Sequence, residues 1–302
     1  MNEFLSLYRR NVKMFFKDKG LFFTSLATPL ILLVLYATFL SDVYRDSILM
    51  SIGDAMTVPS TLLDGFVGGQ LVSSLLSVSC ITVAFCSNML MVQDKVTHAR
   101  TDFSVSPVRH STLALGYYAA SLTSTLIVCY TAAALCFVYL AVIGWYLSLA
   151  DVLLLLLDVL LLSMLGTSLS GVINSFLSSQ GQISAVGSIV SSCYGFISGA
   201  YMPISSFSPV LQRIIGFLPG TYGTVLLRSH AMRGALTELE KSGVPSSVVA
   251  DMKSGLDCEI AFFGESVPSA VMFAILIGAV LLCTLAYVLL VRLRGKKARK
   301  AS

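Results

Sequence analysis

The side chains that could carry out chemistry are few in this chain, and their spacing matches no familiar catalytic or metal-binding motif. The three histidines, His98, His110 and His230, have no H-E-x-x-H spacing and no obvious nucleophile partner. The seven cysteines show no metal or redox spacing. The sequence G-x-x-x-x-G-K-[ST], which cradles ATP phosphates, does not occur. We therefore expect the chain to bind no metal and no cofactor, and an enzyme is disfavoured.

One ionisable residue stands where a charge is unusual. Asp158 is the one acid well within a long apolar run, DVLLLLLDVLLLSMLG. An acid placed inside a membrane is by default a functional candidate with a partner. Asp158 also lies about two helical turns from the outer end of its run, where water or an outer arginine could reach it. Both a functional role for this intramembrane acid and a merely tolerated position stay open.

The elements that must position these residues are long apolar segments. Apolar residues make up 56% of the chain and charged residues 12%, and the mean hydropathy is +0.84. Soluble domains carry about a quarter charged residues, so this composition predicts a polytopic membrane protein. The spans should be α-helices, because no alternating ten-residue pattern is present. The expected fold is thus all-α with six transmembrane helices of roughly 20 residues or more, at Leu21–Leu40, Phe66–Val92, Leu113–Ile143, Val152–Phe176, Ile183–Met202 and Ala270–Val291.

Basic residues gather in three parts of the chain. Fourteen of the 20 Lys and Arg residues lie in residues 1–20, in the 93–110 loop and after the last span. Such residues flank spans on the cytoplasmic side. Both termini and the 93–110 loop are therefore predicted to be cytoplasmic, in a multi-pass protein of the cell membrane, with the bacterial inner membrane as the expected location. Nucleic acid is not an expected partner, because the basic residues flank spans.

The segments outside the spans have distinct patterns. Residues 1–20 predict an amphipathic helix with its apolar face in lipid and its basic face on anionic head groups; it could be a topology anchor or also a docking surface. Residues 21–292 form the six-helix domain, and 293–302 a basic cytoplasmic tail. Within 203–268, prolines interrupt an apolar stretch that is too short to span. We expect an outer re-entrant hairpin there, covered by protein, between helices 5 and 6.

Two spans carry small residues at four-residue intervals, and several aromatic residues lie near them. Such stripes allow close helix packing, and lining a transport path is the alternative. The residues assigned to a path or to packing are Phe66, Gly69, Ser73, Ser77 and Phe85 in the second span, and Ser188, Ser191, Tyr194, Gly195, Phe196, Gly199 and Tyr201 in the fifth.

Three stretches carry a resemblance to a known family. They are Val92–Val108 (VQDKVTHARTDFSVSPV), Gly199–Ile204 (GAYMPI) and Leu218–Arg228 (LPGTYGTVLLR). In this order, and with six spans, the chain resembles over essentially its whole length the membrane subunits of the ABC-2 type transporter superfamily, in the style of bacterial drug and antibiotic exporter permeases. It departs from the family pattern at His98, where glycine is common, and at Asp94, where glutamate is usual.

The resemblance implies how the chain would work. Two six-helix permeases, as a homodimer or a heterodimer with a related permease, would each dock on a separate ATP-binding subunit, and ATP and Mg²⁺ would bind to those two subunits. The transport path would lie between the permeases, with spans 1, 2 and 5 contributing. The loop after span 2 would be a coupling helix. Its role is carried to Asp94, Lys95, His98, Arg100, Asp102, Phe103 and Pro107, with Arg9, Arg10 and Lys13 as secondary contacts.

The function that follows as an expectation is ATP-driven export of an amphipathic or hydrophobic molecule such as a drug, antibiotic, lipid or peptide. One alternative is an ion-coupled secondary transporter, which needs intramembrane charges and has only Asp158 to support it. The other alternative is a membrane enzyme or a receptor subunit. Membrane lipids are expected partners under each of these readings.

Overall fold

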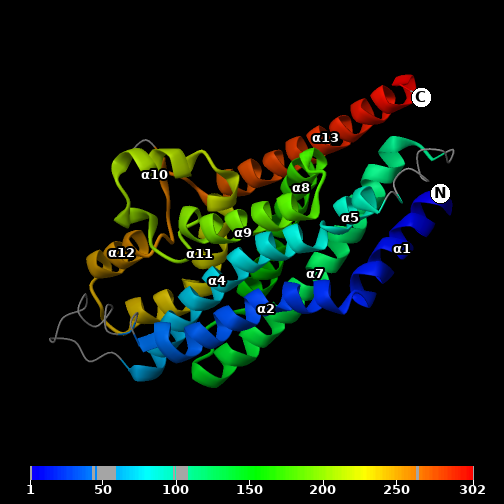
Figure 1. Ribbon diagram of the computed structural model, residues 1–302. Coiled ribbons are helices and arrows are strands. Elements are labelled where there is room, and N and C mark those ends of the chain that lie inside the picture. Colours follow the sequence, from blue (N-terminus) through cyan, green and yellow to red (C-terminus); the bar gives the residue numbers. More distant parts are fainter. Residues whose placement is uncertain are drawn as a thin grey trace.

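The protein is an elongated helical bundle with both termini at the same end (Figure 1). The computed structural model describes residues 2–42, 45, 59–97, 99, 108–262 and 265–301. Within these residues the only strands are β1 (Ala261–Phe262) and β2 (Glu265–Ser266), an antiparallel pair in which Ala261 lies opposite Ser266. The long helices are α4 (Ser60–Ser87), α7 (His110–Ile143), α8 (Leu149–Phe176) and α13 (Ser269–Ala301).

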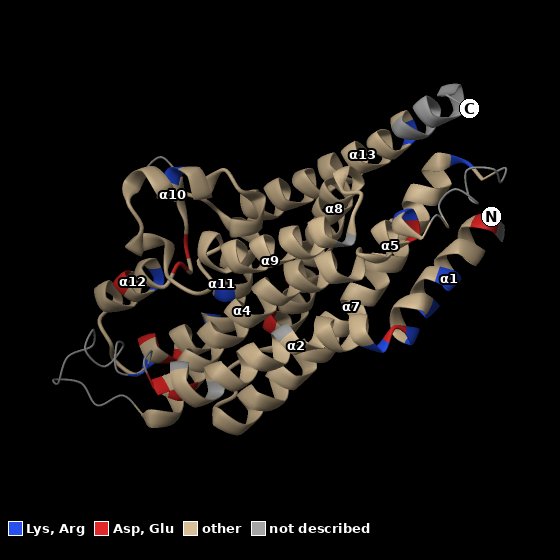
Figure 2. Ribbon diagram, viewed as in Figure 1, with Lys and Arg blue, Asp and Glu red and all other residues tan. Residues whose placement is uncertain are grey.

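Four helical segments in the described part of the chain are long and apolar enough to cross a membrane. They are Ser60–Val96, His110–Ile143, Leu149–Phe176 and Ser269–Leu293, and the number rises to six if each of two bent helix pairs is one span. Charged residues gather toward the two ends of the bundle, and few lie between them (Figure 2). The predicted all-α polytopic membrane fold is confirmed at this level.

Helix α4 forms the centre of the bundle. In its most apolar window 89% of the residues are buried, against 33% for α7 and 22% for α13. Helices α2, α7, α8 and α11 pack around it. A helix that is apolar on all sides suits this position, because it has no polar face to turn to water. The exposed apolar residues of α7 and α13 suit contact with lipid.

The N-terminal segment folds as a sharply bent pair of helices. Helix α1 (Asn2–Lys17) and α2 (Lys19–Leu35) meet at 73°. Asp18 caps α2, because its side chain accepts a hydrogen bond from the backbone N–H of Leu21 at 3.0 Å. Part of the apolar face of α1 packs on α7 rather than lying wholly in lipid as expected, since Leu7 is buried against Gly116. Helix α2 continues through Pro29 and ends in a π-helical turn, η1 (Tyr36–Leu40).

The fifth predicted span is shorter and more polar than expected. Helix α9 (Gln180–Ile197) ends five residues before the predicted end at Met202 and is not among the segments that are long and apolar enough to span. It packs on α4 and leaves many of its side chains exposed. The earlier end of α9 has a local cause, because Gly199 has φ +75° and turns the chain there.

The segment between α9 and α13 contains one long helix that lies inside the bundle. The elements are η2 (Ile204–Ser206), α10 (Pro209–Gly216), α11 (Pro219–Lys241) and α12 (Ser246–Gly255). Helices α10 and α11 meet at 93°. Helix α11 packs against α4, α8 and α13, so protein surrounds much of this interrupted segment.

The close approach of α4 to α11 gives a testable difference between two glycines. A Cβ at Gly69 would lie 2.7 Å from the carbonyl oxygen of Ala231, whereas a Cβ at Gly187 would meet nothing within 4 Å. Gly69→Ala should therefore lower the free energy of unfolding by about 1–3 kcal/mol. Gly187→Ala, the matched control, should leave it unchanged or slightly higher. Equal losses in unfolding experiments in mixed micelles would contradict this packing.

Candidate functional site

At the end of the bundle that holds both termini, a buried acid joins three helices. Asp94 lies in α5 (Leu90–Val96), and only 2% of its surface is exposed. Arg10 of α1 donates two hydrogen bonds to it, from Nη1 to Oδ2 at 2.7 Å and from Nη2 to Oδ1 at 2.9 Å. Tyr117 of α7 donates a third. The hydrogen bond from Arg10 to Asp94 raises the pKa of that guanidinium above its ordinary value. The cluster fixes α1, α5 and α7 to one another.

The next residue of α5 joins it to a fourth helix. Lys95 Nζ donates to the carbonyl oxygens of Asn174, Ser175 and Leu177 at 2.8, 3.1 and 2.9 Å. These carbonyls stand at the C-terminus of α8, where backbone acceptors have no partner within the helix and a cation is favoured. Lys95 thus fixes α5 to the end of α8, as Asp94 fixes it to α1 and α7.

The other residues assigned to coupling fall into two groups. Arg9 and Lys13 are exposed on α1, beside Arg10 in sequence but without its buried contact. Their charges can meet a partner or lipid head groups. The remaining assigned residues lie outside the described part of the chain; they are His98, Arg100, Asp102, Phe103 and Pro107.

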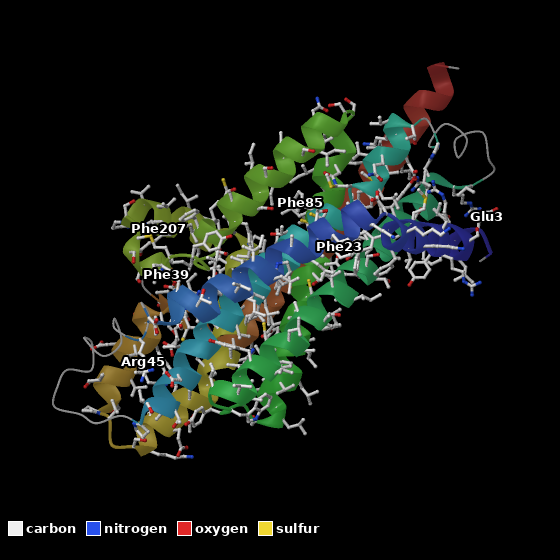
Figure 3. The ribbon with its side chains drawn as sticks, turned by 60° about the horizontal axis from the view of Figure 1, so that its bottom comes forward. Glu3, Phe23, Phe39, Arg45, Phe85 and Phe207 are labelled. Carbon is white, nitrogen blue, oxygen red and sulfur yellow. The ribbon has the colours of Figure 1, made fainter. Side chains whose placement is uncertain are left out.

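A cleft of about 450 Å³ lies between α2, α4 and α9. Its walls bring together three residues assigned to the path or to packing, namely Phe85, Ser188 and Ser191. Phe85 lies in the space between α2 and α9 (Figure 3). Hydroxyl groups of Thr24 and Thr82 also line the cleft, so it offers both apolar surface and hydrogen-bonding groups. Such a mixed lining suits an amphipathic molecule.

The other residues of that group lie in packing contacts. Phe66, Gly69 and Ser73 are buried in α4. The hydroxyl oxygen of Ser77 lies 2.5 Å from that of Thr224 in α11. In the fifth predicted span, Tyr194 donates a hydrogen bond to the carbonyl of Gly220 at 3.2 Å, and the carbonyl of Gly199 accepts one from Arg228 at 2.7 Å. The ring of Tyr201 folds back on α9. Gly195 faces this ring, and Phe196 meets it edge to face at a centroid distance of 5.3 Å.

Asp158 has a hydrogen-bonding partner on α11. Its Oδ2 lies 2.6 Å from Nδ1 of His230, and both side chains are buried. The sequence indicated no nucleophile partner for His230, and its contact with Asp158 was not predicted. Among the described residues no arginine forms an ion pair with Asp158, and Arg233 pairs with Asp151 at 2.5 Å. The sequence offered one clue to this contact, because Asp158 is the single acid of its predicted span and His230 is the single histidine of α11.

A fully buried arginine joins α11 to the turn after α9 and to the segment after α12. Arg228 of α11, 0% exposed, donates to the carbonyls of Gly199 and Leu256 at 2.7 and 2.9 Å and pairs with Asp257 at 3.2 Å. Asp257 also accepts from the backbone N–H of Ile204 at 2.6 Å. Burial raises the pKa of Asp257, and the charge of Arg228 opposes that rise. Sequence reasoning noted Arg228 only as the end of a motif and missed Asp257.

Two comparisons with known proteins bear on these sites. A family model described as ABC-2 type transporter matches residues 2–231, which include the Asp94 cluster, the cleft and Arg228. Comparison with curated proteins gives no match. Among the described residues, no group of three or more His, Cys, Asp and Glu side chains is placed to hold a metal ion.

Proposed function

Because this chain belongs to the ABC-2 type transporter family, we propose that it is the membrane-spanning subunit of an ATP-driven exporter. The family match over residues 2–231 carries the proposal. The chain has no phosphate-binding loop in its sequence, so a separate ATP-binding subunit would hydrolyse the nucleotide. ATP and Mg²⁺ would bind to two copies of that subunit, and this chain would bind neither.

The contacts of α5 support a route for force from that partner into the membrane. Asp94 joins α5 to α1 and α7, and Lys95 joins it to the end of α8. A push on the segment after α5 would therefore move several helices together instead of bending one loop. Asp94 and Lys95 act inside this chain in the proposed mechanism. Direct contact with the ATP-binding subunit would fall to exposed Arg9 and Lys13 and to the loop after Thr97.

The cleft between α2, α4 and α9 is the proposed place for the transported molecule. Its hydroxyl groups and the ring of Phe85 support an amphipathic or hydrophobic substrate. Large apolar side chains stand exposed on both sides of it, among them Phe23 and Ile31 on α2 and Ile189 on α9. A second permease copy covering these side chains would enclose the cleft between the two copies. The end with Asp94 and both termini would face the cytoplasm of a cell whose inner membrane holds the complex.

The test is to purify the tagged chain from its native membrane with its bound proteins and to reconstitute the complex in liposomes. We expect an ATP-binding subunit to copurify and outward transport to require ATP hydrolysis by that subunit. Transport by the chain alone, driven by an ion gradient without any ATP-binding partner, would overturn the proposal in favour of a secondary transporter. Catalytic turnover by the lone chain would favour an enzyme.

A further inference from the structure

The contact between Asp158 and His230 holds a titratable pair inside the bundle. The exposed fractions of the two side chains are 0% and 8%, and Nδ1 lies 2.6 Å from Oδ2. The second carboxylate oxygen of Asp158, Oδ1, has no hydrogen-bond partner among the described residues. The coupling clusters at the other end of the bundle do not include this pair.

The net charge of the pair depends on one proton. With one proton shared between Oδ2 and Nδ1 and one more on Nε2, the pair is neutral, whichever residue holds the shared proton. Loss of one of these two protons leaves the pair with a buried negative charge, which is unfavourable without a compensating cation. The two nearest cations on α11 are already occupied, since Arg233 pairs with Asp151 and Arg228 with Asp257. The surroundings therefore favour the neutral, protonated pair.

His230 also lines a cleft of about 210 Å³ beside α11 and α12. Helix α12, which contributes Lys253 to the cleft, lies at the end of the bundle away from both termini (Figure 1). Phe273 of α13 stacks on the imidazole at a centroid distance of 6.1 Å. Of the two members of the pair, only His230 reaches the cleft, so a proton from water there meets the histidine first.

Most of the elements packed around the pair carry charged groups. Helix α8 contributes Asp151, and the one charged residue of α4 is Asp64, which pairs with Arg45 at 2.9 Å. Helix α13 presents the uncharged Ser269 and Phe273. The titratable groups of the cleft are Arg233 and Glu240 from α11, Lys253 from α12, and Cys258 and Glu259 from the following connection. Lys253 and Glu240 pair at 3.2 Å, and the hydrogen-bond partner of His230 among the described residues is Asp158.

We propose that Asp158 and His230 form a proton-binding site that opens to the outer side of the membrane through this cleft. A proton from water in the cleft binds to Nε2 of His230, and the proton on Nδ1 passes to Oδ2 of Asp158. The products are a neutral imidazole and a neutral carboxyl group, so one proton is taken up and one negative charge is removed. The site binds its proton whether or not ATP is the energy source for transport.

The test uses the full chain in liposomes with the cleft facing the external solution, observed by infrared difference spectroscopy. Acidifying only the external solution should produce, besides the bands of exposed acids such as Glu240 and Glu259, a separate C=O band from the buried carboxyl group of Asp158 in the wild-type protein. Asp158→Asn should lack this band. A band that follows only the internal pH, or one that persists in Asp158→Asn, would overturn the proposal, as would the absence of any such band in the wild type.

Two further variants keep the test decisive if Asp158→Asn does not fold. His230→Gln retains the carboxyl group and removes the relay, so its band should lose the response to external pH. Thr237→Trp fills the cleft from its exposed wall and should slow the response at least several-fold. Glu240→Gln, on the same wall, is the matched control and should leave band and rate unchanged. A response in His230→Gln as fast as in the wild type would refute the role of the histidine.

Discussion

Replacing Arg228 by methionine should lower the free energy of unfolding by about 3–5 kcal/mol, the range for removing one partner of a buried ion pair. The substitution leaves Asp257 buried without its counter-ion and leaves the carbonyls of Gly199 and Leu256 without their donor. Equilibrium unfolding in mixed micelles measures the loss. Lys241→Met is the matched control on the same helix. Its ion pair with Glu238 is exposed, so the change should stay within about 0.5 kcal/mol.

Two further measurements identify the uncompensated charge as the cause. Arg228→Met combined with Asp257→Asn should be more stable than Arg228→Met alone, because the buried charge is gone while an oxygen acceptor remains. Without Arg228, the pKa of Asp257 should rise further above its ordinary value. An acid whose pKa is higher in the folded than in the unfolded chain stabilises the fold at low pH and loses that contribution as pH rises through the folded pKa. The single variant should therefore regain stability on acidification, and a constant deficit at all pH values would contradict this cause.

Asp94→Arg should reduce transport per ATP hydrolysed by about tenfold in the assembled complex, equivalent to about 1.4 kcal/mol. The substitution places two cations together and removes the acceptor for Tyr117, so α5 separates from α1 and α7. Because Arg10 is partly exposed, we expect a smaller free-energy loss than for breaking a fully buried ion pair. Parallel measurement of ATP hydrolysis and transport gives the ratio.

The charge-swapped pair Arg10→Asp with Asp94→Arg separates transmission from folding. It should recover part of the coupling, because opposite charges face each other again across α1 and α5. Lys17→Asp, at the exposed end of α1, is the control and should couple normally. If the swapped pair stays as uncoupled as Asp94→Arg while its helical content and assembly are normal, the ion pair is not the transmitting contact.

Much of the membrane architecture was predictable because its signals are local. The end of α7 was predicted at Ile143, where the structure has it, since Gly144 and a polar turn follow. Helix α8 begins at Leu149 behind a capping box in which Ser148 and Asp151 exchange hydrogen bonds. Where a long apolar run is bounded by such turn and capping residues, the helix ends can be predicted from the sequence.

The contacts that build the sites were harder to predict because their partners are far apart in sequence. Asp94 and Arg10 are 84 residues apart, and Asp158 and His230 are 72 residues apart. Helix α11 carries Arg228 and His230, so its composition resembles a polar outer segment. Its burial follows from ion pairs with other elements, and composition and periodicity do not encode such pairs.

The position of α11 has a consequence for how the protein is made. Because α11 carries an arginine and a histidine, its insertion into the lipid bilayer without protein partners would be unfavourable. It fits only where α4, α8 and the outer connection already supply Ser77, Asp158 and Asp257 as partners. We therefore expect the translocation machinery to release this stretch to the far side of the membrane. The stretch would then enter the bundle late, after its neighbours are in place, so that the final step of biogenesis closes the outer half of the molecule.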